Sequence, residues 1–239
     1  MTGVARWQQI AAALSEEITN GTLKPGEQLP TEQGLATRFR VNRHTARRAM
    51  EELSRAGLIR IEQGRGTFVT GDVLAYVVGA RTRFSEWIRR YNREPFGRVL
   101  ELRQLPASAA VATGLGIAKG AIAVLFVRVG LADGQPVSLA DHYFPADRLP
   151  GIMAALGAEA GITAALASVG VADYVRQSTR VSARLPSIAE ATALAMSRHL
   201  PLLVCENVNV DRAGQVIEYT LARYPTPRVQ IVFEPEAAV

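Results

Sequence analysis

The chain has 239 residues, 48% of them hydrophobic, with 27 Lys and Arg side chains against 22 Asp and Glu. These values indicate one or two globular domains and exclude a disordered or fibrous protein. The single cysteine, Cys205, cannot form an internal disulfide, no run reaches the roughly 18 apolar residues of a membrane span, and no secretory signal pattern is present. We therefore expect a cytoplasmic protein that does not enter a membrane.

Positive charge is concentrated in the first part of the chain. Residues 1–100 hold 16 basic and 10 acidic side chains, whereas residues 101–239 hold 11 and 12. A surface that attracts a negatively charged partner is therefore expected in the N-terminal part.

The first 56 residues predict three helices. Apolar residues at helical spacing before Gly21 predict a helix over residues 7–20. Thr31 is the expected N-cap of a short second helix, and Asn42 is the expected N-cap of a third helix over residues 43–56. Two short strands follow, at 58–61 and 67–69, which predicts a helix-turn-helix followed by a β-hairpin wing.

The third helix separates basic from apolar side chains. Arg43 and Arg47 are four residues apart and share a face, as do His44 and Arg48. Guanidinium groups match guanine in the major groove and also pair with phosphate, so this face suits a helix that reads DNA. Arg65 lies between two glycines in the expected wing, where the backbone can approach a phosphate closely. The alternative is a solvated charged face on a small helical bundle.

Residues 81–239 predict a separate domain that is richer in strands. One helix carries Phe84 and Trp87, and the Asp133-Gly134 pair predicts a hairpin turn. Strands are expected at 99–104, 122–132, 137–144, 174–185, 202–211, 216–224 and 229–234, with helices at 108–114, 162–169 and 187–198. Because hairpins join most strands, we expect an antiparallel α+β domain, linked by residues 71–80 to a DNA-binding domain of residues 1–70.

The N-terminal part resembles the winged helix-turn-helix of the GntR family of transcriptional regulators. The strings that carry the resemblance are Leu23-Lys24-Pro25-Gly26, Leu29-Pro30-Thr31-Glu32, Val41-Asn42-Arg43-His44-Thr45, Gly57-Leu58-Ile59 and Gly64-Arg65-Gly66-Thr67-Phe68-Val69. The resemblance implies a homodimer that binds an inverted-repeat operator in double-stranded DNA. It also implies DNA contacts by Gln33, Arg43, Thr45, Arg47, Gln63, Gly64 and Arg65. His44 and Arg48 are further candidates from their place on the helix, and His44 is otherwise an exposed or packing side chain.

The second part resembles the effector-binding domain of the HutC branch of that family, a chorismate-lyase-like fold of the UTRA type. Within that branch it is similar to regulators of phosphonate metabolism, through Arg83-Phe84-Ser85, Asp141-His142-Tyr143-Phe144 and Gln177-Ser178-Thr179-Arg180-Val181-Ser182-Ala183-Arg184. The resemblance implies a repressor of genes for phosphonate or phosphate uptake or metabolism, whose effector is a small phosphonate or phosphate. The chain departs from many relatives at Gly130, where a second arginine often stands.

Several polar residues of this domain are candidates to bind an anion. Ser85 is expected to begin a helix, whose free N–H groups favour an anion, and Arg83 lies beside it. Arg128 interrupts an apolar strand and needs an anionic partner, either a ligand or a carboxylate such as Asp141 or Glu218.

One strand offers alternating arginines. Arg176, Arg180 and Arg184 fall on even positions and are expected to share a face, and of the three we favour Arg180 for the effector. The resemblance places Glu218, Tyr219 and Arg223 among the ligand-lining residues. Asp141 and Tyr143 either line the pocket or orient an arginine.

The sequence contains no clear pattern for a metal site, a cofactor site or a catalytic site. The three histidines lack ligand spacing, so we expect no metal, and nothing predicts a cofactor. No nucleophile with its base and no paired carboxylates stand out, so we expect no enzyme, although a residual lyase activity stays open. A regulator that answers to a sugar phosphate or a carboxylate is the main alternative.

Overall fold

The structure is a computed structural model, and it describes residues 5–55, 58–62, 64–70, 73–81, 83–158, 161–196 and 198–234. The chain divides into two compact units, Met1–Val73 and Leu74–Val239. The second unit therefore begins inside the segment that we expected to be a linker. Leu74–Val77 forms a buried strand of that unit, whose partner lies about 150 residues further along the chain.

The first unit, called the head below, contains three helices. They are α1 (Arg6–Thr19), α2 (Glu32–Phe39) and α3 (Arg43–Arg55). The expected caps are present: the Thr31 hydroxyl accepts a hydrogen bond from the Gly34 N–H, and the Asn42 side chain accepts one from the Thr45 N–H. These bonds satisfy donors that a helix leaves free at its start, so the sequence fixes where α2 and α3 begin.

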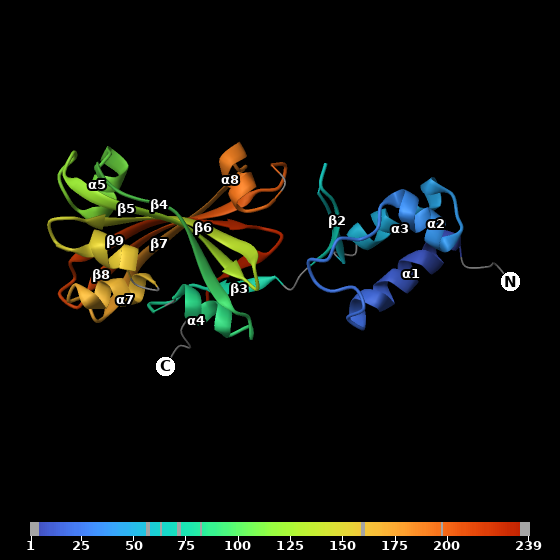
Figure 1. Cartoon of the computed structure of the whole chain (residues 1–239), viewed down its shortest axis with the longest axis horizontal. Coiled ribbons are helices and arrows are strands. Elements are labelled where there is room, and N and C mark those ends of the chain that lie inside the picture. The colour runs from blue at the N-terminus through green and yellow to red at the C-terminus, as the bar shows by residue number, and fades with distance from the viewer. Residues whose placement is uncertain are drawn as a thin grey trace. The chain divides into compact units, whose positions relative to one another are not determined.

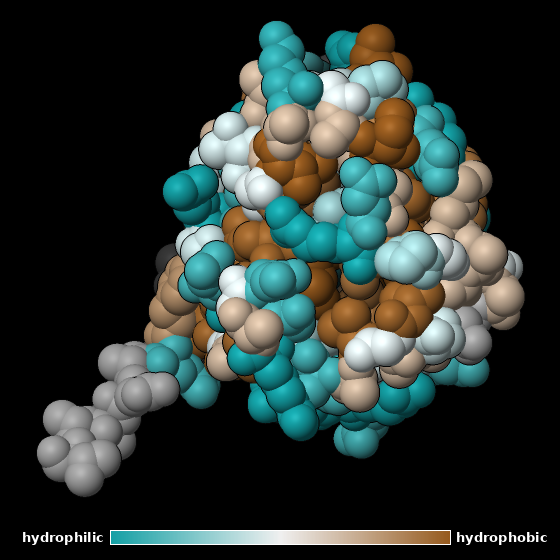
Figure 2. Space-filling view, turned by 90° about the vertical axis from the view of Figure 1, so that its left-hand side faces the viewer, coloured by the Kyte–Doolittle hydropathy of each residue, from teal (hydrophilic) through white to brown (hydrophobic). Residues whose placement is uncertain are grey.

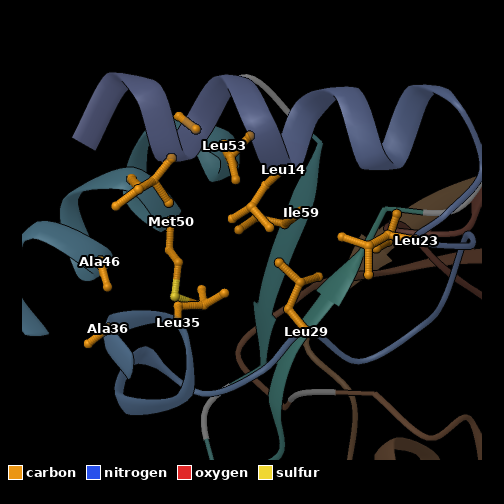
Figure 3. Close-up of a cluster of buried hydrophobic side chains, with 13 residues drawn as sticks. Leu14, Leu23, Leu29, Leu35, Ala36, Ala46, Met50, Leu53 and Ile59 are labelled. Carbon is orange, nitrogen blue, oxygen red and sulfur yellow. The ribbon is translucent and has the colours of Figure 1, made fainter. Parts of the chain in front are cut away.

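The core of the head lies where the three helices meet the wing. Leu14, Leu35, Met50 and Ile59 point toward one another from α1, α2, α3 and the first strand (Figure 3). The wing consists of β1 (Ile59–Glu62) and β2 (Gly66–Val69), which pair antiparallel. The segment before α2 adds to β2 through the bond from the Leu29 N–H to the Thr67 carbonyl (2.7 Å). This bond ties β2 of the wing to the segment that leads into α2.

The second unit is built on one antiparallel sheet of six strands in the order β4-β5-β6-β9-β8-β7. Their bounds are β4 (Pro95–Pro106), β5 (Ile122–Ala132), β6 (Gln135–Pro145), β7 (Tyr174–Arg184), β8 (Leu202–Asp211) and β9 (Val216–Pro225). Asp133 and Gly134 both have positive φ in the tight turn between β5 and β6, as a two-residue hairpin requires. The expected antiparallel α+β class is confirmed.

Helices cover both faces of this sheet (Figure 1). On one face, called the outer face below, lie α5 (Ala109–Leu115) and α8 (Ile188–Ala193), at opposite ends. On the other, called the inner face below, lie α4 (Phe84–Arg89), α6 (Ile152–Ala158) and α7 (Ile162–Ser168). Two short strands, β3 (Leu74–Val77) and β10 (Val229–Val232), pair in parallel and pack on the inner face as well.

Four elements differ from expectation, and one of them is β4, which extends beyond the expected 99–104 at both ends. Strand β3 and helix α6 were not predicted, because each is short and only two residues of either are fully buried. Helix α8 ends at Ala193 rather than at residue 198, since Ala195 adopts a left-handed conformation (φ 46°) that a helix cannot continue through. Within the described ranges, no helix is long and apolar enough to cross a membrane. At the end of the second unit seen in Figure 2, hydrophobic surface lies in patches between hydrophilic side chains.

Candidate functional sites

A groove on the head is lined by α2, α3 and the wing, and two arginines of α3 lie in it. The Nε of Arg43 contacts Glu32 Oε2 at 2.6 Å, and the Nε of Arg47 contacts Glu51 Oε1 at 3.0 Å. Both arginine side chains are more than 60% exposed. The cationic ends of these two side chains are therefore open to a partner.

The other predicted residues of α3 differ in their surroundings. His44 is exposed, whereas the Arg48 guanidinium lies over the ring of Trp7 at 4.6 Å from its centroid, which turns it toward α1. The Thr45 hydroxyl donates to the Asn42 side chain at 2.9 Å. Of the three, Arg48 is the one that the fold uses for packing, since a guanidinium stacked on an indole is held by a cation–π interaction.

The wing carries Arg65 between two glycines with positive φ, Gly64 and Gly66. Arg65 Nη1 contacts Glu62 at 2.9 Å, and the Gln28 side-chain amide donates to the Arg65 carbonyl. Gln33 lines the groove beside α3, and Gln63 lies outside the described residues. Gln33, Arg43 and Arg47 thus share one groove, whereas Arg48 is turned toward α1 and Arg65 lies in the turn of the wing.

A cavity of about 520 Å³ lies in the second unit, between the inner face of the sheet and the elements α4, α7 and β3. Of the predicted effector residues, Arg83, Ser85, Arg128 and Glu218 line it. Helix α4 begins at Phe84 rather than at Ser85, with Arg83 as a cap residue that makes no side-chain capping bond. Arg83 instead donates to the Thr163 hydroxyl (3.0 Å) and lies over the Tyr174 ring, so it joins α4 to α7 at the cavity wall.

Arg128 is the notable charge of this cavity. Its guanidinium lies 5.3 Å from the centroid of the Phe84 ring, and no carboxylate of the described residues lies within ion-pair distance of it. Burial lowers the pKa of Arg128, and the charge of Glu218 opposes that effect at longer range. A Cβ on Gly97 would come within 2.4 Å of Arg128 Nη2, so the glycine provides the space that the guanidinium fills. The arginine is thus packed in place with no described carboxylate in direct contact.

Glu218 makes no ion pair with Arg128, and its oxygens bond to other residues of the cavity wall. Oε1 accepts from His142 Nδ1 at 2.6 Å and Oε2 accepts from the Asn209 amide, with the side chain 4% exposed. Burial raises the pKa of Glu218, but the bonds from His142 and Asn209 and the charge of Arg176 outweigh it and lower the pKa. The carboxylate is therefore held ionised in the cavity wall.

Arg176 is a cavity residue that our sequence analysis placed second to Arg180. It donates to the Tyr76 hydroxyl at 2.8 Å and to the Asn209 side chain at 3.3 Å. The strand has a bulge between Arg176 and Ser178, which reverses the side-chain alternation beyond it. Arg180 and Arg184 consequently pair with Glu206 and Leu202 on the outer face, and the prediction that the three arginines share one face is wrong.

Five predicted effector residues do not line the cavity. They are Asp141, Tyr143, Arg180, Tyr219 and Arg223. Successive residues of a strand point to opposite faces, so Tyr219 and Arg223 cannot share a face with Glu218, and Asp141 and Tyr143 cannot share one with His142. On the outer face the Arg223 guanidinium binds both oxygens of Asp141. Of the two roles considered for Asp141, the structure thus shows the one in which it orients an arginine.

The outer-face arginines take part in an ion-pair network at α8. Arg223 Nε lies 3.4 Å from Glu190, which also binds the Arg184 guanidinium. Hydrogen bonds from Arg184 are the largest of several effects that lower the pKa of Glu190, to about 2. Glu190 also completes a capping box with Ser187 at the start of α8. These residues therefore have a structural role that the resemblance did not indicate.

His142 and Tyr76 line the cavity, although neither was predicted as a site residue. His142 was present in a quoted string, and the alternation from Glu218 across paired strands indicates it, because His142 and Thr220 are register partners. No local signal indicates Tyr76, since its strand was not predicted. Among the residues with a described placement, no cluster of His, Cys, Asp and Glu could hold a metal ion.

Close packing explains why residue 130 is a glycine. A Cβ there would lie 2.4 Å from the Ser138 hydroxyl and 2.5 Å from the Phe84 ring. Phe84 therefore occupies the space above this position, next to Arg128. No side chain larger than hydrogen fits at residue 130 in this arrangement, so the cavity presents a single arginine from β5.

Both units match families of known proteins. Residues 6–69 match bacterial regulatory proteins of the gntR family, and residues 90–230 match the UTRA domain. The chain is 37% identical over 233 residues to an uncharacterized HTH-type transcriptional regulator of Rhizobium meliloti (97% of this chain, 96% of the relative). It is 31% identical over 230 residues to the probable transcriptional regulator PhnF of Escherichia coli (96% and 95%). It is also similar in structure to PhnF from Mycobacterium smegmatis, with a TM-score of 0.67, 25% identity and coverage of 96% of this chain and 100% of the other.

Proposed function

This chain belongs to the GntR family of bacterial regulatory proteins, as a HutC-type transcriptional regulator with a UTRA domain, and from that premise we propose a homodimeric repressor controlled by a small anion. The head binds operator DNA, and the cavity of the second unit binds the effector. Two heads related by a two-fold axis match an inverted repeat, whose half-sites lie about 34 Å apart or a multiple of it.

DNA binding is assigned to the groove side of the head. Arg43 and Arg47 present exposed guanidinium groups from one face of α3, and Arg65 extends from the wing. A recognition helix enters the major groove with such side chains, while a wing contacts the backbone or the minor groove. Gln33, His44 and Thr45 flank this surface and are proposed as additional contacts.

The observation that carries the effector proposal is the guanidinium of Arg128, which has no carboxylate within ion-pair distance among the described residues. A half-buried cation of this kind is partly stripped of water, and a bound anion offsets that cost through charge-assisted hydrogen bonds. Arg83, Arg89 and Arg176 also line the cavity, against the carboxylates of Glu86 and Glu218. The positive balance of the cavity favours an anionic ligand.

Resemblance to the PhnF regulators favours a phosphonate or a phosphate as that anion. The cavity of about 520 Å³ also accommodates a larger ligand, because sites for drug-sized molecules start at about 300 Å³. A sugar phosphate or a carboxylate metabolite is therefore the second candidate, and the chain keeps only one arginine from β5 to hold it.

The effector signal reaches the head through β3. This strand follows the head directly in the chain, and its Tyr76 lines the cavity. The Trp87 indole donates to the Ala75 carbonyl at 2.9 Å, which ties β3 to the helix α4 that lines the same cavity, and the Tyr91 hydroxyl just after α4 accepts from the Ala75 N–H at 2.8 Å. A ligand that moves Arg128, Phe84 or Arg176 thus acts on the first element after the head. The size of the response is limited by the difference in ligand affinity between the two states.

The test has two steps. First, the full chain selects duplexes from a random pool, and its mass in solution is measured free and bound; one inverted repeat bound by a dimer is expected. Second, methylphosphonate, aminoethylphosphonate, phosphate and a sugar phosphate are titrated into the complex. Release by a phosphonate or phosphate alone supports the full proposal, and release by the sugar phosphate alone selects the alternative. No response to any of the four overturns the anion assignment, and no sequence preference overturns operator binding.

Catalysis is not part of this proposal. The chain's relatives are named transcriptional regulators, and His142 is bonded within the cavity wall to Glu218 and to the Thr220 hydroxyl. Turnover of chorismate by the purified chain would contradict a purely regulatory role.

A further inference from the structure

The two groove arginines of α3 are held in the same way. In each case a carboxylate contacts the Nε atom: Glu32 from α2 contacts Arg43, and Glu51, one turn along α3, contacts Arg47. Among the described residues, neither guanidinium has another hydrogen-bond partner. No described residue therefore hydrogen-bonds the two terminal nitrogens of either fork.

This geometry matters for reading a base. An arginine reads guanine with two parallel N–H donors, directed at O6 and N7. If Nε is occupied by a carboxylate, the remaining pair is Nη1 and Nη2, which point along the axis of the side chain. The carboxylate thus selects an end-on approach of the arginine to the base. It also restricts the arginine side chain before binding, which lowers the conformational entropy lost when DNA binds.

Glu32 is itself fixed before DNA arrives. It is the first residue of α2, where the helix dipole favours a negative charge, and Thr31 caps the same turn. Arg43 is the first residue of α3, where the dipole disfavours a positive charge. The contact between Glu32 and Arg43 relieves that disfavoured placement and joins the two helices of the motif.

We propose that Glu32 and Glu51 are positioning residues for DNA recognition, which orient Arg43 and Arg47 through Nε and reduce the attraction of the head for DNA of arbitrary sequence. This inference rests on the proposed function of the head. Exposed ion pairs of this kind contribute little to stability, so their main consequence is for the interface. Phosphates attract positive charge whatever the sequence, and each carboxylate in the groove lowers that attraction.

The experiment compares full-length variants on two duplexes, the operator selected from a random pool and a scrambled duplex of the same composition. The variants are Glu32→Ala, Glu32→Gln and Glu51→Ala. The control is Glu52→Ala, which removes the same charge from α3, where Glu52 pairs with Arg55 and does not line the groove. Thermal midpoints verify that every variant is folded.

For Glu32→Ala we expect the ratio of operator to scrambled affinity to fall about fivefold or more, through both a weaker operator complex and a tighter scrambled complex. Glu32→Gln keeps an acceptor for Nε and is expected to recover part of the operator affinity. Glu51→Ala should act in the same direction, whereas Glu52→Ala should leave the ratio within about twofold.

The proposal is overturned if Glu32→Ala and Glu51→Ala leave the ratio unchanged, or if Glu52→Ala lowers it equally. Should Glu32→Ala not fold, Glu32→Gln and Glu51→Ala decide the question. Failure of the proposed function looks different, because the unmodified chain then selects no duplex from the pool at all.

Discussion

The indole Nε1 of Trp87 donates a hydrogen bond to the backbone carbonyl of Ala75 at 2.9 Å. The N–H of Ala75 donates to the Tyr91 hydroxyl. Both backbone groups of Ala75 are therefore bound by side chains of the segment that contains Trp87 and Tyr91. Neither bond belongs to the pairing of β3 with β10. The first strand of the second unit is thereby tied to the helix that lines the effector cavity.

Loss of one of these ties should weaken the response more than the binding. Tyr91→Phe removes the hydroxyl that bonds Ala75, at a cost of about 1 kcal/mol of stability. We expect the effector to bind within about twofold of its normal affinity, while its effect on operator affinity decreases. Calorimetry of effector binding and operator titration with saturating effector measure the two quantities. A variant whose effector binding and operator response decline in parallel would show that the bond serves the cavity itself.

Arg128 should matter for the ligand and not for the fold. Arg128→Met removes a half-buried guanidinium that has no carboxylate partner, so the thermal midpoint without ligand should stay the same or rise. The stabilisation by a bound phosphonate should disappear, because a charge-assisted bond of about 2 kcal/mol is lost. Arg212→Ala, at an exposed arginine outside the cavity, is the control. Destabilisation of the free protein by Arg128→Met would indicate an internal partner.

Gly130 should tolerate no side chain. Gly130→Ala places a Cβ against Ser138 and the Phe84 ring, and overpacking of this kind costs about 1–3 kcal/mol. Gly157→Ala is the matched change, since Gly157 is an exposed position of α6, the nearest atom to a Cβ there would be 3.7 Å away, and alanine favours a helix. Chemical denaturation of both variants measures the difference. Equal stability of the two would mean that Phe84 moves aside at little cost.

Acid should weaken the outer-face network through Glu190. Its pKa is lowered from 4.5 to about 2 in the folded chain, so its contribution is complete above pH 4.5 and is lost as the pH falls toward 2. Because the pair is partly open to solvent, we expect on the order of 1 kcal/mol. Glu190→Gln should therefore be less stable than the natural chain at pH 6 and approach it at pH 3. Unfolding followed by Trp87 fluorescence in a Trp7→Phe background reports on this unit, with Glu101→Gln as the control.

Arg43 should discriminate between bases. Arg43→Ala is expected to remove about 1–3 kcal/mol of preference for the operator over duplexes changed at one position. Competition binding at fixed salt across a set of single-base variants measures that preference. Uniform weakening on all duplexes would instead identify Arg43 as a phosphate contact.

Short-range signals in the sequence determined much of the fold. The caps Thr31 and Asn42, the Asp133-Gly134 turn and the alternating strands act within a few residues, so their structures follow from local chemistry. The head was predictable for that reason, together with the face that carries Arg43 and Arg47. The same alternation indicates that Glu218 and Tyr219 face opposite sides of the sheet, a constraint that the resemblance to relatives overrode.

Only the tertiary structure decided which side chains share the cavity. Beyond the bulge that follows Arg176, the side chains of β7 point to the opposite faces of the sheet. The bulge depends on pairing with β8 about 30 residues away. Strand β3 becomes part of the second unit only by pairing with β10, and Phe84 reaches Gly130 only across the fold. Such placements depend on contacts between distant segments, which neither residue spacing nor local propensity encodes. The sequence therefore determined the elements and their chemistry, and packing determined that Arg176 and Arg128, and not Arg180 and Arg223, face the site.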